Sequence, residues 1–323
     1  MDDEESKKQM LELSLNEAVR REWIVSTGAR IANIFDHFPT LSTIHRADKS
    51  LGIAMLESIL LKLPKLRARY YSVSSSPQKE GNNKFSLTVG RVTWRGGYNK
   101  RMYLGFCSDF LATLPLETNV VVEMRPAPSF RLPRAPETPI LMVAGGTGIA
   151  PFKGFVDHLT VNKAGTTQGD AWLIVGCQTK NNQLYRHELE TAAENKVLTK
   201  YLVGYSREST EPKRYIDVVM RENADGIRDL IARGGHVYVC GDIRIEESVR
   251  KALVDILGNG DAVKVKDLLP ISPDTGTAAL AQLEKEHKIH LDIFGAFDVH
   301  GTQKKQLEAA LTKIKEIKVK NDP

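Results

Sequence analysis

The amino-acid sequence predicts an α/β protein that also contains a β-barrel-like domain and a helical segment. After about residue 138, apolar runs that end in Gly or Cys alternate with helical patterns, which is typical of βαβ units and a mostly parallel sheet. Between residues 69 and 134, short β-like runs are separated by turns rich in Gly and Pro. Before residue 64, apolar side chains recur at helical spacing and predict two to four helices.

These patterns divide the chain into four segments. We predict a helical segment over residues 1–64, a β-rich domain with an incomplete barrel over 65–136, an α/β domain over 137–300 and a tail over 301–323. The runs expected to form strands are 85–92, 120–124, 140–144, 171–176, 201–204 and 236–240.

The tail has the pattern of an amphipathic helix. Between residues 303 and 320, Leu307, Leu311 and Ile314 share one helical face among several lysines. A solvated helix packed on the body is the favoured interpretation, and docking to a membrane or a partner is the alternative.

Composition excludes several functional classes. The formal net charge of +5 is spread along the 323 residues, and no dense basic and aromatic run predicts a nucleic-acid site. Cys107, Cys177 and Cys240 lack the short paired spacing of a metal site or a disulfide framework, so we expect no metal and a reducing compartment. An acidic N-terminus and the absence of a run of about 20 apolar residues predict a cytoplasmic chain without a membrane span.

A glycine-rich turn follows the apolar run 140–144. Gly146, Thr147 and Gly148 let a backbone approach a pyrophosphate, and the helix that begins near Pro151 offers unpaired N–H groups to it. The sequence therefore predicts a dinucleotide site, although a glycine-rich turn that binds no ligand is an alternative.

The next two strand ends indicate which dinucleotide binds. The run 171–176 ends at Cys177 without a carboxylate for a ribose 2′-hydroxyl. After the following run come four residues that could hold a 2′-phosphate: Ser206, Arg207, Lys213 and Tyr215. Two charge-assisted bonds would favour NADPH over NADH by about two to four orders of magnitude. An ordinary polar strand end is the alternative.

A second ligand is indicated near residue 70. Arg69, Tyr70, Tyr71 and Ser72 combine a cation, aromatic rings and a hydroxyl, which suit the pyrophosphate, the isoalloxazine ring and the N5 edge of a flavin. A β-strand with no ligand is the alternative.

Five ordered motifs now resemble one family. They are Arg69-Tyr70-Tyr71-Ser72, Gly105-Phe106-Cys107-Ser108, the turn Gly146 to Phe152, Ser206-Arg207 with Lys213 and Tyr215, and Cys240-Gly241-Asp242. Their order and spacing resemble those of NADPH–cytochrome P450 reductases and other diflavin reductases, from about residue 22 to residue 294. The resemblance implies a ferredoxin reductase-like fold, with FAD on the barrel, NADP on the parallel sheet and a helical connecting segment.

The resemblance also implies roles for single residues. For FAD, Arg69 contacts the pyrophosphate, Tyr71 stacks on the ring, Ser72 lies near N5, Trp94 faces the adenine, and Gly105, Phe106, Cys107 and Ser108 form the phosphate loop, with Tyr70 beside them. For NADPH, Gly146, Thr147 and Gly148 hold the pyrophosphate, and Cys240 and Asp242 lie beside the nicotinamide. Asp292 is the acidic residue of the closing segment, and Phe294 covers the flavin where the family usually has Trp. A short apolar strand over residues 291–294 is the alternative.

By this resemblance we expect an NADPH–hemoprotein reductase-like flavoprotein. Hydride would pass from NADPH to FAD, with Ser72, Cys240 and Asp292 as the catalytic residues. We expect that no FMN module precedes these motifs and that the first barrel strands are missing. We therefore expect electrons to leave for an external acceptor, a P450-type haem protein reached through a separate FMN or carrier protein.

Two alternatives remain open from the sequence. One is a simpler enzyme of the ferredoxin reductase superfamily, or a diaphorase, that reduces a soluble carrier. The other is a degenerate, non-catalytic NADP-binding remnant or interaction module that does not retain FAD.

Overall fold

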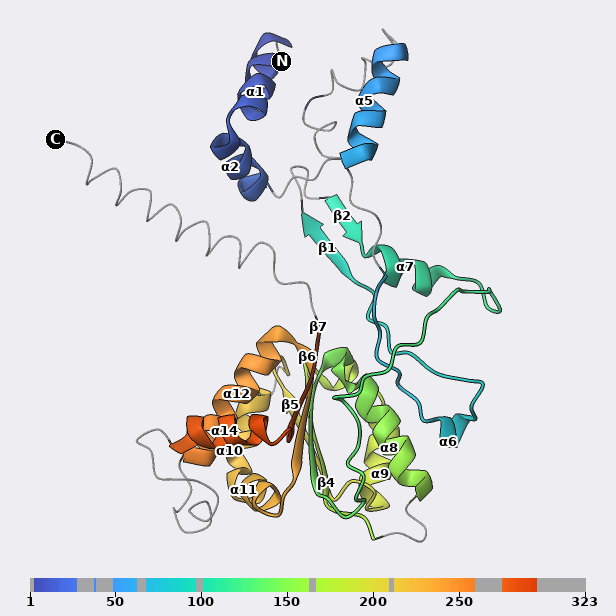
Figure 1. Ribbon diagram of the computed structural model, residues 1–323, viewed down its shortest axis with the longest axis vertical. Coiled ribbons are helices and arrows are strands. Elements are labelled where there is room, and N and C mark those ends of the chain that lie inside the picture. Colours follow the sequence, from blue (N-terminus) through green and yellow to red (C-terminus); the bar gives the residue numbers. More distant parts are fainter. Residues whose placement is uncertain are drawn as a thin grey trace, which may run out of the picture. The chain divides into compact units, whose positions relative to one another are not determined.

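A computed structural model describes residues 3–27, 38, 49–62, 68–96, 101–162, 167–208, 212–258 and 275–294 (Figure 1). The chain divides into two compact units. The first consists of Met1–Tyr70, Gly90–Thr118 and Ala296–Pro323, and the second of Tyr71–Val89 and Asn119–Gly295. The four segment boundaries predicted from the sequence stay predictions, and the predicted helical tail lies outside the described residues.

The described N-terminal part of the first unit is helical, as predicted. It contains α1 (Asp3–Leu15), α2 (Glu17–Thr27) and α5 (Lys49–Lys62). Helix α2 begins where it does because the Asn16 side chain accepts hydrogen bonds from the backbone N–H groups of Ala18 and Val19, at 3.1 and 3.3 Å. Among the helices that the structure describes, none combines the length and the apolar composition needed to cross a bilayer.

A short antiparallel hairpin and one helix complete the described part of this unit. Strands β1 (Thr93–Gly96) and β2 (Arg101–Leu104) pair with each other. The rings of Trp94 and Tyr103 lie opposite each other in the register and stack with centroids 5.6 Å apart. Helix α7 (Phe106–Thr113) follows β2 directly.

The second unit is built on a five-stranded parallel sheet. Its strands are β3 (Ile140–Gly145), β4 (Ala171–Cys177), β5 (Lys200–Tyr205), β6 (His236–Asp242) and β7 (Ile289–Phe294), in the order β5-β4-β3-β6-β7. Each neighbouring pair is parallel, so all five carboxyl ends meet at one edge. The α/β fold with a parallel sheet and a small antiparallel sheet is therefore confirmed.

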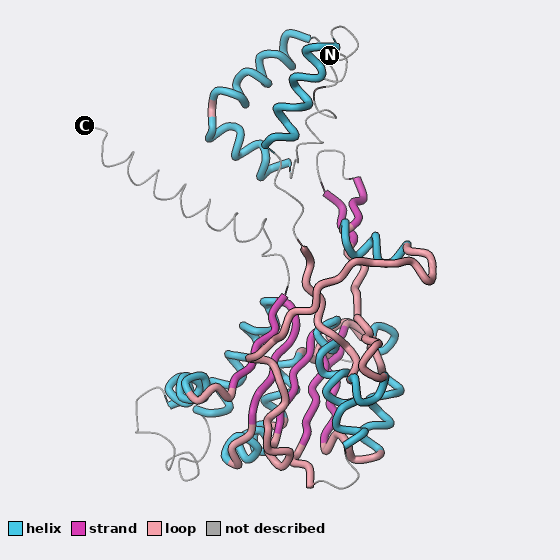
Figure 2. Tube along the Cα trace, turned by 45° about the vertical axis from the view of Figure 1, so that its right-hand side comes forward, coloured by secondary structure: helices cyan, strands magenta, loops and turns pink. Residues whose placement is uncertain are grey.

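Helices cover both faces of this sheet (Figures 1 and 2). Helices α8 (Ala150–Asn162) and α9 (Arg186–Glu194) lie on one face. The other face carries α10 (Ile216–Glu222), α11 (Ala224–Ala232), α12 (Ile243–Gly258) and α14 (Thr275–Lys285). Both faces are covered, which explains why β3 is a continuous apolar run: its residues from Ile140 to Ala144 are all buried.

Two runs that the sequence marks as strands form no strand here. In the described chain, residues 120–124 have no strand partner, and the run 85–92 makes only an isolated bridge from Leu87 to Val73. The side chains of 120–124 are exposed, with Val121 fully so. A strand is stable only when its backbone groups are paired and one face is buried, so β-propensity alone did not decide these runs. The expectation that residues 85–92 and 120–124 form strands was wrong.

Two histidines pair across β6 and β7. The Nδ1 atom of His290 lies 2.6 Å from the carbonyl oxygen of Ser129, which only accepts, so Nδ1–H donates. The Nε2 atom of His290 therefore accepts from Nδ1–H of His236, at 2.8 Å. Burial is the main cause that lowers the pKa of both rings, and the pKa of His236 is lowered further by His290 and Lys288.

We expect acid to destabilise the fold through this pair. A histidine whose folded pKa lies below its ordinary 6.5 binds protons better when unfolded, so stability is full above 6.5 and falls as the pH drops towards the folded value. Urea unfolding at a series of pH values checks this. His290→Gln should flatten the dependence, whereas His187→Gln, at an exposed position, should leave it unchanged. Equal slopes in both variants would contradict the assignment.

Candidate functional site

The glycine-rich turn lies at the carboxyl edge of the sheet, between β3 and α8. Gly146 opens a short 3-10 helix, η1 (Gly146–Ile149), with a φ of 55°, a value that favours glycine. No atom lies within 4 Å of the place where a Gly146 Cβ would be, so this face of the turn is open. A Cβ on Gly148 would lie 2.1 Å from the carbonyl oxygen of Cys240. The turn therefore packs directly on β6 and leaves open space where a pyrophosphate could approach.

This close approach makes Gly148 sensitive to any side chain. We expect Gly148→Ala to lower the free energy of unfolding by about 1–3 kcal/mol, because the new methyl group forces the turn away from β6. Urea unfolding measures the change. Gly258→Ala is the matched control, since a Cβ there would meet its nearest atom at 3.5 Å, an ordinary contact. Equal stability of the two variants would show that the turn is looser than the structure indicates.

The residues predicted to hold a 2′-phosphate lie at the ends of β4 and β5. Ser206 donates from its backbone N–H and from Oγ to the carbonyl oxygen of Cys177, at 3.0 and 3.3 Å. Arg207 donates from Nη1 to Oε1 of Gln178, at 3.3 Å. Burial raises the pKa of the Cys177 thiol to about 11, with a further contribution from Glu208, so this strand end carries no thiolate at neutral pH.

Lys213 and Tyr215 flank Arg214, whose backbone is hydrogen-bonded to the end of β5. The backbone N–H of Arg214 donates to the carbonyl oxygen of Tyr205, at 2.9 Å. The guanidinium of Arg214 pairs with Glu222. Arg207 and Lys213 are exposed and enter no ion pair with the described residues. Two cations at the end of β5 are therefore available to an anion, as the predicted 2′-phosphate site requires.

A hydrogen-bonded cluster lies where β6 and β7 run side by side. Cys240 and Asp292 are register partners in this parallel pair. The Oδ2 atom of Asp292 accepts a hydrogen bond from Oγ–H of Ser72, and the Sγ atom of Cys240 lies 3.7 Å from the same oxygen. The structure thus brings together the three residues predicted to be catalytic. Their catalytic role remains a prediction.

The protonation state of Cys240 follows from its surroundings. The residue is fully buried, and burial followed by the nearby Asp292 carboxylate raises the pKa of the thiol. Cys240 is therefore a neutral S–H donor and not a nucleophile at physiological pH. A carboxylate that accepts from a thiol and a hydroxyl can orient a reacting group and hold a proton in place.

Asp242 and Phe294 end the two strands as register partners. The Oδ1 atom of Asp242 accepts from the backbone N–H of Arg244 at 2.9 Å, and the carboxylate pairs with that guanidinium at 2.8 Å. Hydrogen bonding to Arg244 is the main cause that lowers the pKa of Asp242. The structure thus gives Asp242 a capping role at the start of α12. Phe294 is 40% exposed at the end of β7.

The phosphate loop predicted for FAD begins α7 in the first unit. Gly105 is the N-cap, and Ser108 is buried, with its Oγ 3.3 Å from the carbonyl oxygen of Gly105 and 3.1 Å from the backbone N of Val92. Cys107 is half-buried and Phe106 is exposed. A helix N-terminus whose first turn is held in this way fits a phosphate group.

The other flavin residues divide between the two units. Arg69, Tyr70 and Trp94 belong to the first unit, whereas Tyr71 and Ser72 begin the stretch 71–89 of the second. Arg69 and Tyr70 are exposed, and Tyr71 and Ser72 are half-buried. Each group is described within its own unit, and the flavin contacts of all five remain predictions.

The sequence did not reveal an ion cluster on α8. Lys153 donates to both oxygens of Asp157, at 2.8 and 2.7 Å, and Lys79 donates to Oδ1 at 2.7 Å. The Asp157 side chain is only 4% exposed. A Lys and an Asp four residues apart, with Phe155 and Val156 between them, were the available signal, because charges on the buried face of a helix require partners.

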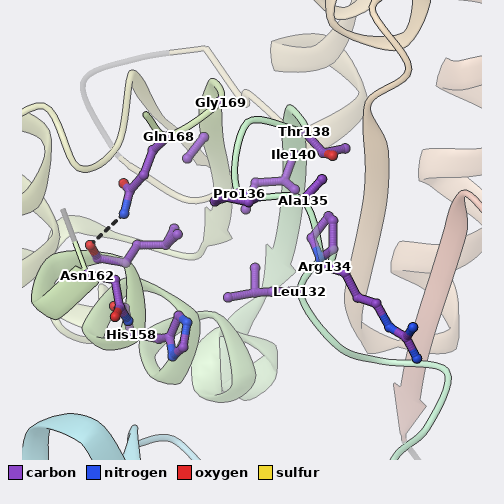
Figure 3. A pocket seen from close by; sticks show the side chains of 13 residues that line it. Leu132, Arg134, Ala135, Pro136, Thr138, Ile140, His158, Asn162, Gln168 and Gly169 are labelled. Carbon is purple, nitrogen blue, oxygen red and sulfur yellow. Dashed lines mark hydrogen bonds between the residues drawn. The ribbon is translucent and has the colours of Figure 1, made fainter. Parts of the chain in front are cut away.

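A pocket in the described part of the chain lies apart from the predicted site residues. A cavity of about 240 Å³ opens at the opposite, amino edge of the sheet, where β3 and β4 begin at Ile140 and Ala171 (Figure 3). The guanidinium of Arg134 points away from it. None of the predicted site residues lines this pocket.

Comparison with known proteins decides the family. Residues 142–251 match the family described as oxidoreductase NAD-binding domain. The chain is 34% identical over 302 residues to a nitric oxide synthase-like protein of Bombyx mori, which covers 91% of this chain and 25% of that protein. It is 40% identical over 189 residues to bifunctional cytochrome P450/NADPH–P450 reductase 2 of Bacillus subtilis (strain 168), covering 58% of this chain and 18% of the relative.

The chain contains an oxidoreductase NAD-binding domain, and its relatives match the FAD/NADPH half of the diflavin reductase family. The match to the oxidoreductase NAD-binding domain spans the glycine turn, the ends of β4 and β5, and Cys240. A third relative, a nitric oxide synthase of Anopheles stephensi, is 31% identical over 299 residues, which make up 91% of this chain and 22% of that protein. The chain thus spans about a quarter or less of the length of these relatives. The resemblance derived from the five motifs is confirmed.

Proposed function

We propose that this chain is an NADPH-dependent, FAD-containing reductase that delivers electrons to an external acceptor. The observation that carries the proposal is the convergence of Ser72 and Cys240 on Asp292. This cluster is continuous with the glycine turn, because Gly148 packs on the backbone of Cys240. A nucleotide whose pyrophosphate follows the turn would therefore have its reactive end near the cluster.

The residues of the chain would bind and orient, and the cofactors would supply the reactivity. When bound, NADPH would supply a hydride, and FAD would accept it and supply single electrons to the acceptor. Arg207 and Lys213 would hold the 2′-phosphate, and Ser206 would add a hydroxyl donor. Asp292 would keep the Ser72 hydroxyl and the Cys240 thiol in place, which fixes the distance and angle of the transfer. The thiol remains protonated throughout.

On the flavin side, we propose that Arg69 pairs with the pyrophosphate of FAD and that Tyr71 stacks on its ring system. Tyr70, Trp94 and the loop Gly105 to Ser108 would complete the binding residues, and Phe294 would shield the ring. The exposure of Arg69 and Phe294 and the position of Gly105 at a helix N-terminus support these assignments.

The acceptor we propose is a P450-type haem protein, reached through a separate FMN or carrier protein. Two relatives from Bacillus subtilis (strain 168) are named bifunctional cytochrome P450/NADPH–P450 reductases, and other relatives are named nitric oxide synthases. These names support a haem-directed electron path for this chain.

An anaerobic titration tests the proposal. The purified chain is mixed with FAD, freed of excess flavin, and titrated with NADPH and separately with NADH while its visible spectrum is recorded. We expect retained flavin to bleach rapidly with NADPH and slowly with NADH.

The second candidate is an NADP-binding remnant or interaction module that does not retain FAD. The exposed run 120–124, which pairs with no strand among the described residues, favours it, because that run lies in the β-rich segment expected to hold the flavin. Binding of NADPH without retention of flavin, even with FAD in excess, would select this candidate and reject the reductase.

A further inference from the structure

The stretch that carries Ser72 forms a loop whose two arms run close together. Val73 bridges to Leu87, and the backbone N–H of Ser74 donates to the carbonyl oxygen of Ser86, at 2.8 Å. The backbone N–H of Ser86 donates in turn to Oγ of Ser75, at 2.9 Å. The short helix α6 (Pro77–Glu80) lies between the two arms in the sequence. Ser72 thus lies at the start of the outgoing arm of this loop, and residues 86–88 form its returning arm.

The outgoing arm lies against α8. A Cβ on Gly154 would be 3.0 Å from the carbonyl oxygen of Ser75, so helix and arm are in close contact. The side chain of Asn162 donates to Oε1 of Gln78. Between these two contacts, Nζ of Lys79 donates to Oδ1 of Asp157, at 2.7 Å.

Both arms converge on one buried cation, Lys153. Its Nζ atom donates hydrogen bonds to both carboxylate oxygens of Asp157, and the same carboxylate pairs with Lys79 of the outgoing arm. The same Nζ lies 5.5 Å from the ring centroid of Tyr185, whose hydroxyl is 2.6 Å from Oγ1 of Thr88 on the returning arm. The side chains of Lys153 and Asp157 are 10% and 4% exposed, so solvent screens their attraction little.

We propose that Lys79 is a positioning residue. Its bond to the Asp157–Lys153 pair holds the arm of Ser72 against α8, and this keeps Ser72 within hydrogen-bonding reach of Asp292. The inference rests on the proposed function in one respect: the bond from Ser72 to Asp292 matters for catalysis only if NADPH reduces bound FAD. The anchoring of the arm itself does not depend on that function.

Lys79 is the residue through which the anchor can be tested without unfolding the chain. Removing Asp157 would leave the buried Lys153 ammonium without its carboxylate, and removing Lys153 would leave the buried Asp157 carboxylate with only the half-exposed Lys79, so both changes are strongly destabilising. Lys79 is 47% exposed, so Lys79→Met leaves the Asp157–Lys153 pair intact and cuts only its link to the arm. Lys84→Met is the matched control, because it removes the same charge from an exposed lysine of the same loop that forms no ion pair within the described chain.

Two measurements separate the anchor from the chemistry. Amide hydrogen exchange of the flavin-free chain reports the bonds of Ser74 and Ser86, and stopped-flow mixing with NADPH reports flavin bleaching. In Lys79→Met we expect faster exchange at these amides and about tenfold slower bleaching, with NADPH affinity unchanged. Lys84→Met should match the original chain, and Lys79→Arg should restore both readouts.

Each other outcome is decisive. Unchanged exchange in Lys79→Met overturns the anchor, and faster exchange with unchanged bleaching overturns the positioning role. If NADPH never bleaches the original chain, the proposed function fails, and the exchange data on the flavin-free chain still decide whether Lys79 anchors the arm.

Discussion

Replacing Arg207 and Lys213 together with alanine is expected to reduce the preference for NADPH over NADH by about two to four orders of magnitude. Both cations lie at the end of β5, are exposed, and form no ion pair within the described chain. Each can therefore give a charge-assisted bond to a 2′-phosphate, which NADH lacks. Affinity for NADH should change little, because these side chains contact nothing in a nucleotide without that phosphate.

Equilibrium binding of the two nucleotides to the flavin-free chain measures this preference, so the result does not depend on FAD. Arg214→Ala is the control, because it removes a cation from the same loop whose guanidinium is already paired with Glu222. The control should keep most of the preference. Added salt should weaken NADPH binding to the original chain more than binding to the double variant. A preference that survives the double replacement would place the 2′-phosphate elsewhere.

Four strands of the parallel sheet, β3 to β6, were predicted from local sequence, whereas β7 was not among the predicted strand runs. Burial on both faces forces each central strand to be apolar throughout. An apolar run such as Ile140 to Ala144, followed by glycine, therefore predicts both the strand and the turn after it. The N-terminal helices were predicted for a similar reason, since apolar residues recur in the sequence at the spacing of one helical face. Each of these elements is determined by residues close together in the chain.

The runs 85–92 and 120–124 show where local pattern fails. Their residues favour β structure, yet a strand also requires a partner, and the sequence does not say whether one is present. Asp242 has a contact that the sequence did not predict. Its carboxylate pairs with Arg244 at the start of α12, and its place beside the nicotinamide stays a prediction.

Long-range polar contacts were the hardest to foresee. The Asp157 carboxylate meets Lys153 within one helix and Lys79 from a distant arm, and only the fold reveals the second partner. Family resemblance named Ser72 and Asp292 as catalytic residues, and only the fold shows that their side chains meet. Periodicity describes faces of elements, whereas such contacts depend on how the elements pack.

Asp292→Asn is expected to slow NADPH-driven flavin bleaching about a hundredfold. The Oδ2 atom of Asp292 accepts from both Ser72 and Cys240. An Asn side chain that presents its oxygen there is a neutral and weaker acceptor, and one that presents its NH₂ group there accepts from neither donor. The hydroxyl and the thiol would then lose their common anchor, so the reacting groups would be misplaced while the remote phosphate contacts persist. Nucleotide affinity should therefore stay nearly constant.

Stopped-flow bleaching and nucleotide binding, measured on the same preparations, separate these two effects. Asp255→Asn is the control, since that carboxylate pairs with Arg221 at the surface. The pH profile supplies a further test. Burial, and then Asp292, raises the pKa of Cys240, so the thiol remains protonated as the pH passes its ordinary value of 9.0, and the original chain should lose no rate there through thiol ionisation. A rate that falls near that pH in the original chain, but not in Cys240→Ala, would mean that the thiol ionises and is not the buried S–H donor described here.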